Sequence, residues 1–218
     1  MEMGDTSRGG AKYLFLITDD YSRKSWAFTL GRKSEVIDCF VPWLAQVQTE
    51  TGETLAFWGT DGGGEFGSNA MEEILAKNGT VHEITPAYTS RRNSRSERLN
   101  LTTAEGIATV RVQSGLGPEW WAEIAYSFIH AKNLSPHGGI DFDVPETLWD
   151  PSRVPYVGHL RPIGCRGTMV RLKAQERIAK SGPKGRTVIM LGYVPTRKAY
   201  RVWDPVTDTI HEPSQHAM

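Results

Sequence analysis

The order of strand-like and helix-like segments in the first half of the chain is the feature that most restricts its fold. Short apolar runs predict strands, and helical spacing of apolar residues between suitable caps predicts helices. In chain order these are strands at 11–19 and 24–30, a helix from Ser34 to Gly52, a strand at 55–59, a helix at 69–78, a strand at 81–84 and a helix from about 93 to 113. Alternation of this kind is typical of an α/β domain. Pro42 lies inside the first helix, where we expect a kink or a break.

The second half of the chain has a different pattern. Pro118 opens a further helix that continues to Asn133, and residues 135–158 are rich in proline and glycine, as linkers are. Beyond this linker, strand-like runs alternate with turns at 168–172, 187–191, 199–203 and 209–211, which indicates a small β-barrel. The sequence therefore predicts a core domain at 1–134, a linker at 135–158, a β domain at 159–213 and a tail at 214–218.

The formal net charge of zero hides an uneven distribution of charge along the 218 residues. Residues 1–160 hold 14 basic and 21 acidic side chains, whereas residues 161–218 hold 11 basic and 4 acidic ones. Within 161–201, Glu176 is the single acidic residue. A basic block of this kind favours a polyanionic partner such as nucleic acid, and the alternative is a basic surface that is merely solvated.

Cysteine usage and hydropathy argue against several other classes of protein. Cys39 and Cys165 lie far apart and no CxxC or HxxxH spacing occurs, so we expect two buried thiols and no zinc site. No apolar run approaches the roughly 18 residues of a membrane span, and no signal peptide precedes the first strand. We therefore expect an intracellular protein, nuclear or cytoplasmic, with no membrane partner.

Two carboxylates stand out by their place relative to the predicted elements. Asp61 follows the apolar run Leu55–Trp58 and stands in a turn rich in glycine, where a ligand is able to approach the backbone closely. Glu97 stands near the start of a helix, with 35 residues between it and Asp61. Taken alone, Asp61 is explained as a turn residue, and Glu97 as an acid favoured by the positive end of the helix dipole.

Five blocks of the sequence resemble the integrases of copia-type retrotransposons. Thr60–Phe66 is similar to (S/T)-D-N-G-G-E-F, and Asn93–Arg98 is similar to N-G-x-x-E-R. The other blocks are Tyr13–Arg23, which resembles Y-F-x-x-x-I-D-D-Y-S-R, His159–Cys165, which resembles H-L-R-V-F-G-C, and Leu191–Tyr193 with Ala199–Pro205, which resemble the module after the core. The 35 intervening residues match the family's spacing for its second and third catalytic carboxylates.

The resemblance implies a ribonuclease-H-like core, with a mixed five-stranded sheet and flanking helices, followed by a small SH3-like β-barrel. It also implies DNA integration by metal-dependent phosphodiester cleavage and strand transfer. Asp61 and Glu97 would be catalytic residues and ligands of Mg²⁺ or Mn²⁺ in a two-metal site. The implied partner is DNA, as element ends and target duplex, and homo-oligomerisation is left open.

The family's first catalytic Asp has no match, because the chain starts just after the block that carries it. Asp5 is the nearest Asp and a candidate for that role, but loss of the residue is favoured. We therefore expect an inactive, truncated remnant in which residues 1–10 pair as a poor strand, or two central strands lose a partner. Gly62, Ser94, Leu99 and Leu101 also depart from the family pattern, which weakens the case for an active enzyme.

Residues expected to bind nucleic acid flank Glu97 or lie in the basic block: Arg91, Arg92, Asn93, Arg95, Arg98, Arg171, Lys173, Arg177, Lys180, Lys184 and Arg186. Two alternatives to an integrase remain open. One is a non-catalytic nucleic-acid-binding module that uses the basic C-terminal domain, and the other is a nuclease or recombinase that acts through Asp5. Asp19 and Asp20 are assigned to a turn, and His82, His130 and His159 to ordinary hydrogen-bonded positions.

Overall fold

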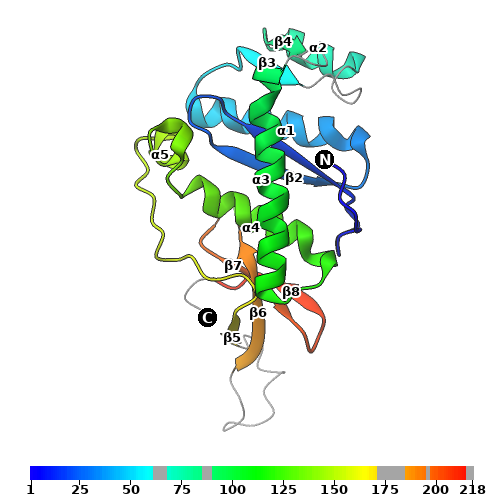
Figure 1. Cartoon of the computed structure of the whole chain (residues 1–218), viewed down its shortest axis with the longest axis vertical. Helices are drawn as coiled ribbons and strands as arrows, with labels where there is room; N and C mark the ends of the chain where they lie inside the picture. Colours follow the sequence, from blue (N-terminus) through cyan, green and yellow to red (C-terminus); the bar gives the residue numbers. More distant parts are fainter. Residues whose placement is uncertain (61–67, 85–89, 171–184, 195–196, 215–218) are drawn as a thin grey trace. The chain divides into compact units, whose positions relative to one another are not determined.

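The structure is a computed structural model that describes residues 1–60, 68–84, 90–170, 185–194 and 197–214, with the side chains of 90–94 left out of the description. It contains two compact units (Figure 1). Unit 1 comprises Met1–Thr18 and Ser25–Thr102, and unit 2 comprises Asp19–Lys24 and Thr103–Met218. Each unit is described by itself. The domain boundaries expected from the sequence stay a prediction.

The strands of unit 1 form two separate two-stranded sheets. Strands β1 (Tyr13–Thr18) and β2 (Ser25–Leu30) are antiparallel, with Tyr13 opposite Leu30. Strands β3 (Phe57–Thr60) and β4 (Val81–Ile84) are parallel, with Thr60 opposite Ile84. Among the described residues these four strands are therefore not joined into one sheet.

Residues 1–3 run along one edge of β1. The backbone amide of Leu14 donates to the carbonyl of Met1 at 2.8 Å, and the amide of Met3 donates to the carbonyl of Lys12 at 2.9 Å. An isolated antiparallel bridge joins Glu2 to Tyr13. The pairing that the sequence allowed for residues 1–10 is thus limited to residues 1–3, and the loss of a central strand stays a prediction.

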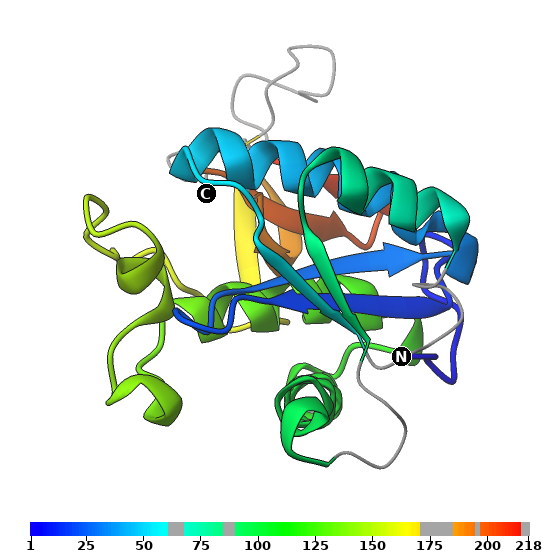
Figure 2. The same cartoon turned by 90° about the horizontal axis from the view of Figure 1, so that it is seen from above.

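Two helices cover one face of these strands. Figure 2 shows α1 (Val36–Thr51) and α2 (Asn69–Lys77) side by side on that face. A 3₁₀ turn, η1 (Lys33–Glu35), precedes α1, and Gly52 ends it in the left-handed conformation that a glycine adopts at little cost. Helix α1 runs through Pro42 without interruption, so the expected break does not occur.

The core of unit 1 lies between these helices and the strands. Its buried side chains come from β1, β2, α1, β3 and α2: Phe15, Ile17, Leu30, Val36, Phe40, Trp43, Leu44, Trp58, Met71 and Leu75. Aromatic rings dominate the centre, where Phe40 and Trp58 have centroids 4.6 Å apart. Rings of this size bury large apolar areas, so they supply much of the stability of this unit.

The helix α3 (Ser90–Ser114) leads from unit 1 into unit 2, and it starts earlier than residue 93. Unit 2 continues with η2 (Pro118–Trp120), α4 (Trp121–Asn133), η3 (Gly138–Ile140) and α5 (Pro145–Trp149). A four-stranded antiparallel sheet follows in the order β5 (Arg166–Val170), β6 (Gly185–Tyr193), β7 (Tyr200–Asp204) and β8 (Thr209–His211). Within the described ranges these strands do not close into a barrel.

Helix α4 is attached to this sheet within unit 2. The Ser127 hydroxyl of α4 donates to the carbonyl of Leu191 on β6 at 2.8 Å. Gly192 lets the two elements approach, because a Cβ atom there would lie 2.1 Å from the Ser127 oxygen. The sheet buries its own core of Val188, Met190, Tyr200 and Val202. Among the described residues, every helix is too short or too polar to cross a membrane.

Candidate catalytic and nucleic-acid-binding residues

The candidate carboxylates are only partly described by the structure. Asp61 belongs to 61–67, outside the described residues, so its distance from Glu97 stays untested. Glu97 is exposed on α3. The buried line of this helix consists of Leu99, Thr103 and Ile107, spaced four residues apart. Leu99 therefore serves packing, whereas Glu97 lies on a different side of the helix and is open to a ligand.

Asp5, the candidate third carboxylate, is exposed in the segment that precedes β1. That segment is folded by a tight turn, in which the amide of Ser7 donates to the carbonyl of Ala11 at 2.8 Å. Among the described residues, no group of three or more His, Cys, Asp or Glu side chains is placed to hold a metal ion. Asp61 is not among the described residues, so the roles of Asp5, Asp61 and Glu97 stay predictions.

Thr60 is the last described residue before 61–67, and its surroundings are defined. Thr60 ends β3, and its hydroxyl lies 2.9 Å from Nε2 of His82 on β4. Nδ1 of the same imidazole lies 2.5 Å from a carboxylate oxygen of Glu72 on α2. His82 is hydrogen-bonded on both sides, as expected. The sequence analysis did not foresee its partners, because no motif links positions 60, 72 and 82.

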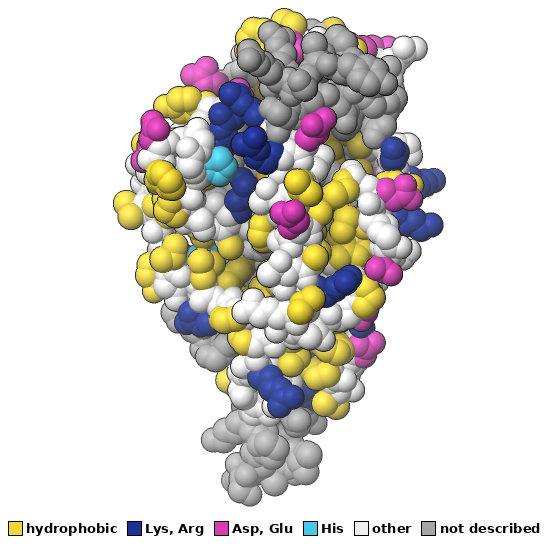
Figure 3. All heavy atoms as spheres, in the orientation of Figure 1, with side chains coloured by type: hydrophobic (Ala, Val, Ile, Leu, Met, Phe, Trp, Pro, Cys, Tyr) yellow, Lys and Arg dark blue, Asp and Glu magenta, His cyan; other side chains and the backbone are white. Residues whose placement is uncertain are grey.

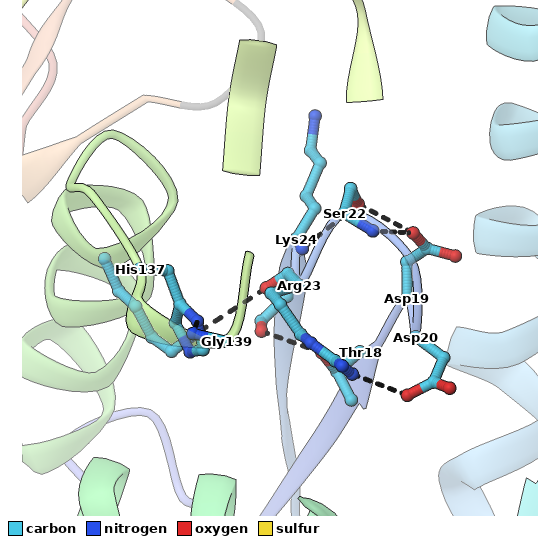
Figure 4. Close-up of polar contacts among 10 residues, drawn as sticks. Thr18, Asp19, Asp20, Ser22, Arg23, Lys24, His137 and Gly139 are labelled. Carbon is cyan, nitrogen blue, oxygen red and sulfur yellow. Dashed lines mark hydrogen bonds and ion pairs between the residues drawn. The ribbon is translucent and has the colours of Figure 1, made fainter. Parts of the chain in front are cut away.

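Asp19 and Asp20 belong to a turn, as the sequence predicted (Figure 4). One carboxylate oxygen of Asp19 accepts from both the amide and the hydroxyl of Ser22 at 2.7 Å. Asp20 forms an ion pair with Arg23 at 2.5 Å, and Arg23 adopts a positive φ of 61°. The turn thus uses both carboxylates locally, which leaves little reason to treat them as metal ligands.

The structure describes some of the candidate nucleic-acid contacts and not others. The side chains of Arg91, Arg92 and Asn93 lie outside the description, as do Arg171, Lys173, Arg177, Lys180 and Lys184. Arg95 and Arg98 are exposed on α3. On the face drawn in Figure 3, described Lys and Arg side chains lie in several separate groups with acidic ones among them. The structure therefore leaves the predicted DNA contacts untested.

Several basic residues of the C-terminal block hold acidic partners. Arg186 pairs with Asp204 at 2.5 Å, and the carboxylate of Asp204 is 0% exposed. Arg201 donates two hydrogen bonds to Glu123 of α4, at 2.8 and 2.9 Å, and a third to Glu212 at 2.5 Å. A basic side chain that is already paired with a neighbouring acid gains less binding energy from a phosphate. The number of basic residues therefore overstates the positive charge that is available to bind DNA.

A pair of histidines lies between α4 and the segment that leads into the C-terminal sheet. Nε2 of His130 and Nε2 of His159 are 3.1 Å apart, and the Tyr193 ring lies 4.6 Å from the His130 ring, centroid to centroid. Burial lowers the pKa of His130 to about 4, and the charge of His159 adds to this effect. Both rings are therefore hydrogen-bonded, as the sequence predicted, and His130 is held neutral at neutral pH.

The fold and the C-terminal sheet define the general class of the chain. Residues 168–216 match the family described as "Retroviral polymerase SH3-like domain". Among solved structures, a chain of the simian T-cell lymphotropic virus intasome in complex with PP2A regulatory subunit B56 gamma matches with a TM-score of 0.54. That match covers 98% of this chain and 73% of the other at 14% identity, which shows likeness of fold alone. The chain is a mixed α/β protein with an SH3-like C-terminal region, which confirms the expected fold class.

Two plant proteins are similar to this chain over most of its length. It is 34% identical over 200 residues to the retrovirus-related Pol polyprotein from transposon TNT 1-94 of Nicotiana tabacum, covering 92% of this chain and 15% of that protein. It is 24% identical over 196 residues to the polyprotein from transposon RE1 of Arabidopsis thaliana, covering 89% of this chain and 13% of that one. The homologues of this chain are therefore retrovirus-related Pol polyproteins of plant copia-type transposons. The chain spans about one seventh of the length of these relatives.

Proposed function

We propose that this chain is the integrase region of a copia-type Pol polyprotein and acts in DNA integration by phosphodiester cleavage and strand transfer. The observation that carries the proposal is the 34% identity over 92% of the chain, together with the Asp61 and Glu97 motifs at the spacing of that family. The solved intasome with the same fold supports it. These findings support an integrase-type region. The activity itself is the proposal, and the inactive remnant expected from the sequence is the opposing outcome that the strand-transfer test below would reveal.

The proposed chemistry needs Mg²⁺ held by Asp61 and Glu97. Asp61 follows the end of β3 in the sequence, and Glu97 is an exposed carboxylate on α3. Mg²⁺ prefers a few carboxylates together with water and phosphate oxygens. When bound, the ions would stabilise the attacking and leaving oxygens of an in-line displacement. The part of this chain is to supply the carboxylates and to hold the DNA phosphates with Arg95 and Arg98.

The test is strand transfer of labelled duplex ends into a target duplex in the presence of Mg²⁺. Asp61→Asn and Glu97→Gln should each lower the rate by about three orders of magnitude, because metal coordination contributes several kcal/mol to the transition state. Glu105→Gln is the matched control, since Glu105 is also an exposed acid of α3 and should leave the rate unchanged. Equal rates in the wild type and both carboxylate variants would contradict the proposed catalysis.

Asp5→Asn separates two versions of the proposal. A loss as large as that of Glu97→Gln would make Asp5 the third carboxylate, as in the nuclease or recombinase alternative. Retained activity would exclude Asp5. The exposed position of Asp5 before β1 keeps the variant informative, because the substitution removes a charge without opening a cavity.

A second function, nucleic-acid binding without catalysis, is favoured by the basic excess at 161–218. In this case the chain binds duplex DNA through its C-terminal region whether or not the carboxylates are intact. Glu97→Gln should then bind a duplex as tightly as the wild type, and neither protein should show strand transfer. Binding that requires Mg²⁺ and Glu97 would argue against this reading.

A further inference from the structure

Side chains from three elements form one chain of hydrogen bonds at the carboxyl end of β3. The Thr60 hydroxyl lies 2.9 Å from Nε2 of His82, and Nδ1 of His82 lies 2.5 Å from a carboxylate oxygen of Glu72. Thr60 ends β3, His82 is the second residue of β4, and Glu72 lies in the first turn of α2. All three belong to unit 1.

The chemistry of the groups fixes the direction of the hydrogen bonds. An ionised carboxylate only accepts, so we assign the imidazole proton to Nδ1, which donates to Glu72. Nε2 of the neutral ring is then an acceptor, and the Thr60 hydroxyl donates to it. A single histidine therefore satisfies a strand hydroxyl on one side and a helix carboxylate on the other.

Because Thr60 and the His82 side chain are buried, loss of the hydrogen bond between them would cost free energy of folding. Thr60 is 8% exposed, and the His82 side chain is 6% exposed, whereas the Glu72 side chain is 48% exposed. The other residues of β4, Val81, Glu83 and Ile84, are all exposed. His82 is thus the one residue through which β4 reaches the interior, and a ring nitrogen there without a partner would carry a desolvation cost.

Backbone pairing alone holds the end of β3 weakly. The sheet has two strands of four residues each, and a two-stranded sheet of this length is marginal. The register places Trp58 opposite His82, so the imidazole reaches diagonally along the strand to Thr60. The hydrogen-bonded chain therefore adds a fixed point at the last residue before Asp61.

We propose that Glu72 and His82 are positioning residues that hold Thr60 and thereby fix the direction in which the backbone leaves β3 towards Asp61. This inference rests on the proposed function for its consequence in catalysis. A hydroxyl, an imidazole and a carboxylate in series also occur in hydrolases that use a serine nucleophile. Here the burial of Thr60 keeps its oxygen from a substrate, so the group holds the strand and does not attack.

The experiment compares wild type with Glu72→Ala, Thr60→Val and Thr60→Ser in the full chain. Glu73→Ala is the matched control, because Glu73 is the neighbouring exposed acid of α2. Amide hydrogen exchange at Thr60 should speed up by about tenfold in Glu72→Ala and Thr60→Val, the effect of losing one hydrogen bond. Thr60→Ser keeps the hydroxyl and should restore slow exchange, and Glu73→Ala should match the wild type.

Two further measurements separate positioning from general stability. The ¹⁵N chemical shifts of the His82 ring should show a protonated Nδ1 in the wild type and lose this signature in Glu72→Ala. In strand transfer, Thr60→Val should lower kcat by about tenfold at an unchanged KM for DNA, and Thr60→Ser should restore kcat.

Three results would overturn the positioning role: a wild-type ring protonated on Nε2, unchanged exchange in Thr60→Val, or equal effects of Glu73→Ala and Glu72→Ala. A wild-type chain without strand transfer would contradict the proposed function. The exchange and NMR results would still decide whether Glu72 and His82 hold the end of β3.

Discussion

At the scale of single residues, the C-terminal unit balances its charges internally. Burial acts to raise the pKa of Asp204, but hydrogen bonds from Arg186 and from the amides of Val206 and Thr207 outweigh it, and the pKa is lowered. The hydrogen bonds to Glu123 raise the pKa of Arg201. These arginines stabilise the fold, which a count of basic residues in the sequence does not reveal.

The half-buried histidine pair makes stability depend on pH. Burial and the charge of His159 lower the pKa of His130 from 6.5 to about 4, and Glu146 opposes this shift. Because the unfolded chain binds the proton and the folded chain does not, stability is complete above pH 6.5 and falls as the pH drops towards 4. The loss should be about 1–2 kcal/mol after allowance for the partial exposure of the ring.

Thermal melts at pH 7.5 and pH 5 measure this loss. His130→Gln removes the titrating group, so the difference in Tm between the two pH values should shrink relative to the wild type. The side chains of His159 and Tyr193 face His130, and Glu146 lies near enough to oppose the shift. An unchanged pH dependence in His130→Gln would show that the pair does not control acid stability.

Residues whose role depends on local pattern were predictable, and those whose role depends on tertiary contact were not. Asp19 and Asp20 were assigned to a turn, and the partners of both carboxylates lie within that turn. The link from Thr60 through His82 to Glu72 was missed, because its partners are 22 and 10 positions apart and no spacing rule connects them. The candidate carboxylates were found by motif alone, and their geometry is untested.

At the scale of elements, periodicity and caps predicted most helices and strands to within a few residues. Gly52 ends α1 as expected, but the helix continues through Pro42, although a proline in the second turn has no amide to donate to the carbonyl four residues earlier. The pairing of residues 1–3 with β1 was one of two alternatives left open by the sequence, because the segment is short and polar. Edge pairing of this kind depends on which backbone groups are left open.

The contact between α4 and β6 gives a prediction at this scale. Gly192→Ala places a Cβ atom 2.1 Å from the Ser127 oxygen, so the hydroxyl must turn away from the carbonyl of Leu191. A buried hydroxyl without its partner costs about 1–3 kcal/mol. Urea unfolding should therefore show a lower midpoint for Gly192→Ala than for the wild type.

Combining Gly192→Ala with Ser127→Ala should restore part of the lost stability. It removes the clashing oxygen and leaves the new Cβ about 3.5 Å from the Ser127 Cβ atom, which is ordinary contact. Gly59→Ala is the control, because a Cβ atom at Gly59 meets nothing within 4 Å. If the double variant is no more stable than Gly192→Ala, the hydroxyl does not carry the contact.

At the scale of the whole molecule, the proposed affinity for DNA should reside in charges without an acidic partner. Affinity for duplex DNA falls with salt by a log–log slope of about −0.9 for each phosphate contact. Arg166 and Lys198 are exposed, whereas Arg186 pairs with buried Asp204. Arg166→Gln and Lys198→Gln should each reduce the slope by about one, and Arg186→Gln should lower Tm instead.

Fluorescence anisotropy of a labelled duplex at several salt concentrations measures these slopes. A wild-type chain whose affinity does not change with salt would contradict phosphate binding altogether. A reduced slope in Arg186→Gln with unchanged Tm would show that this arginine serves DNA and not the fold.

The aromatic core of unit 1 has a spectroscopic consequence. Trp26, Trp43 and Trp58 form one cluster, with ring centroids 5.5 Å apart for the first two and 5.8 Å for the last two. Excitation energy passes readily between indoles at such separations, so the three rings should emit as one reporter. In unit 2, Trp120 and Trp203 form a separate pair at 5.1 Å. Replacing Trp26, Trp43 and Trp58 by phenylalanine would leave tryptophan only in unit 2, so the remaining fluorescence would follow the melting of that unit in an otherwise unlabelled protein.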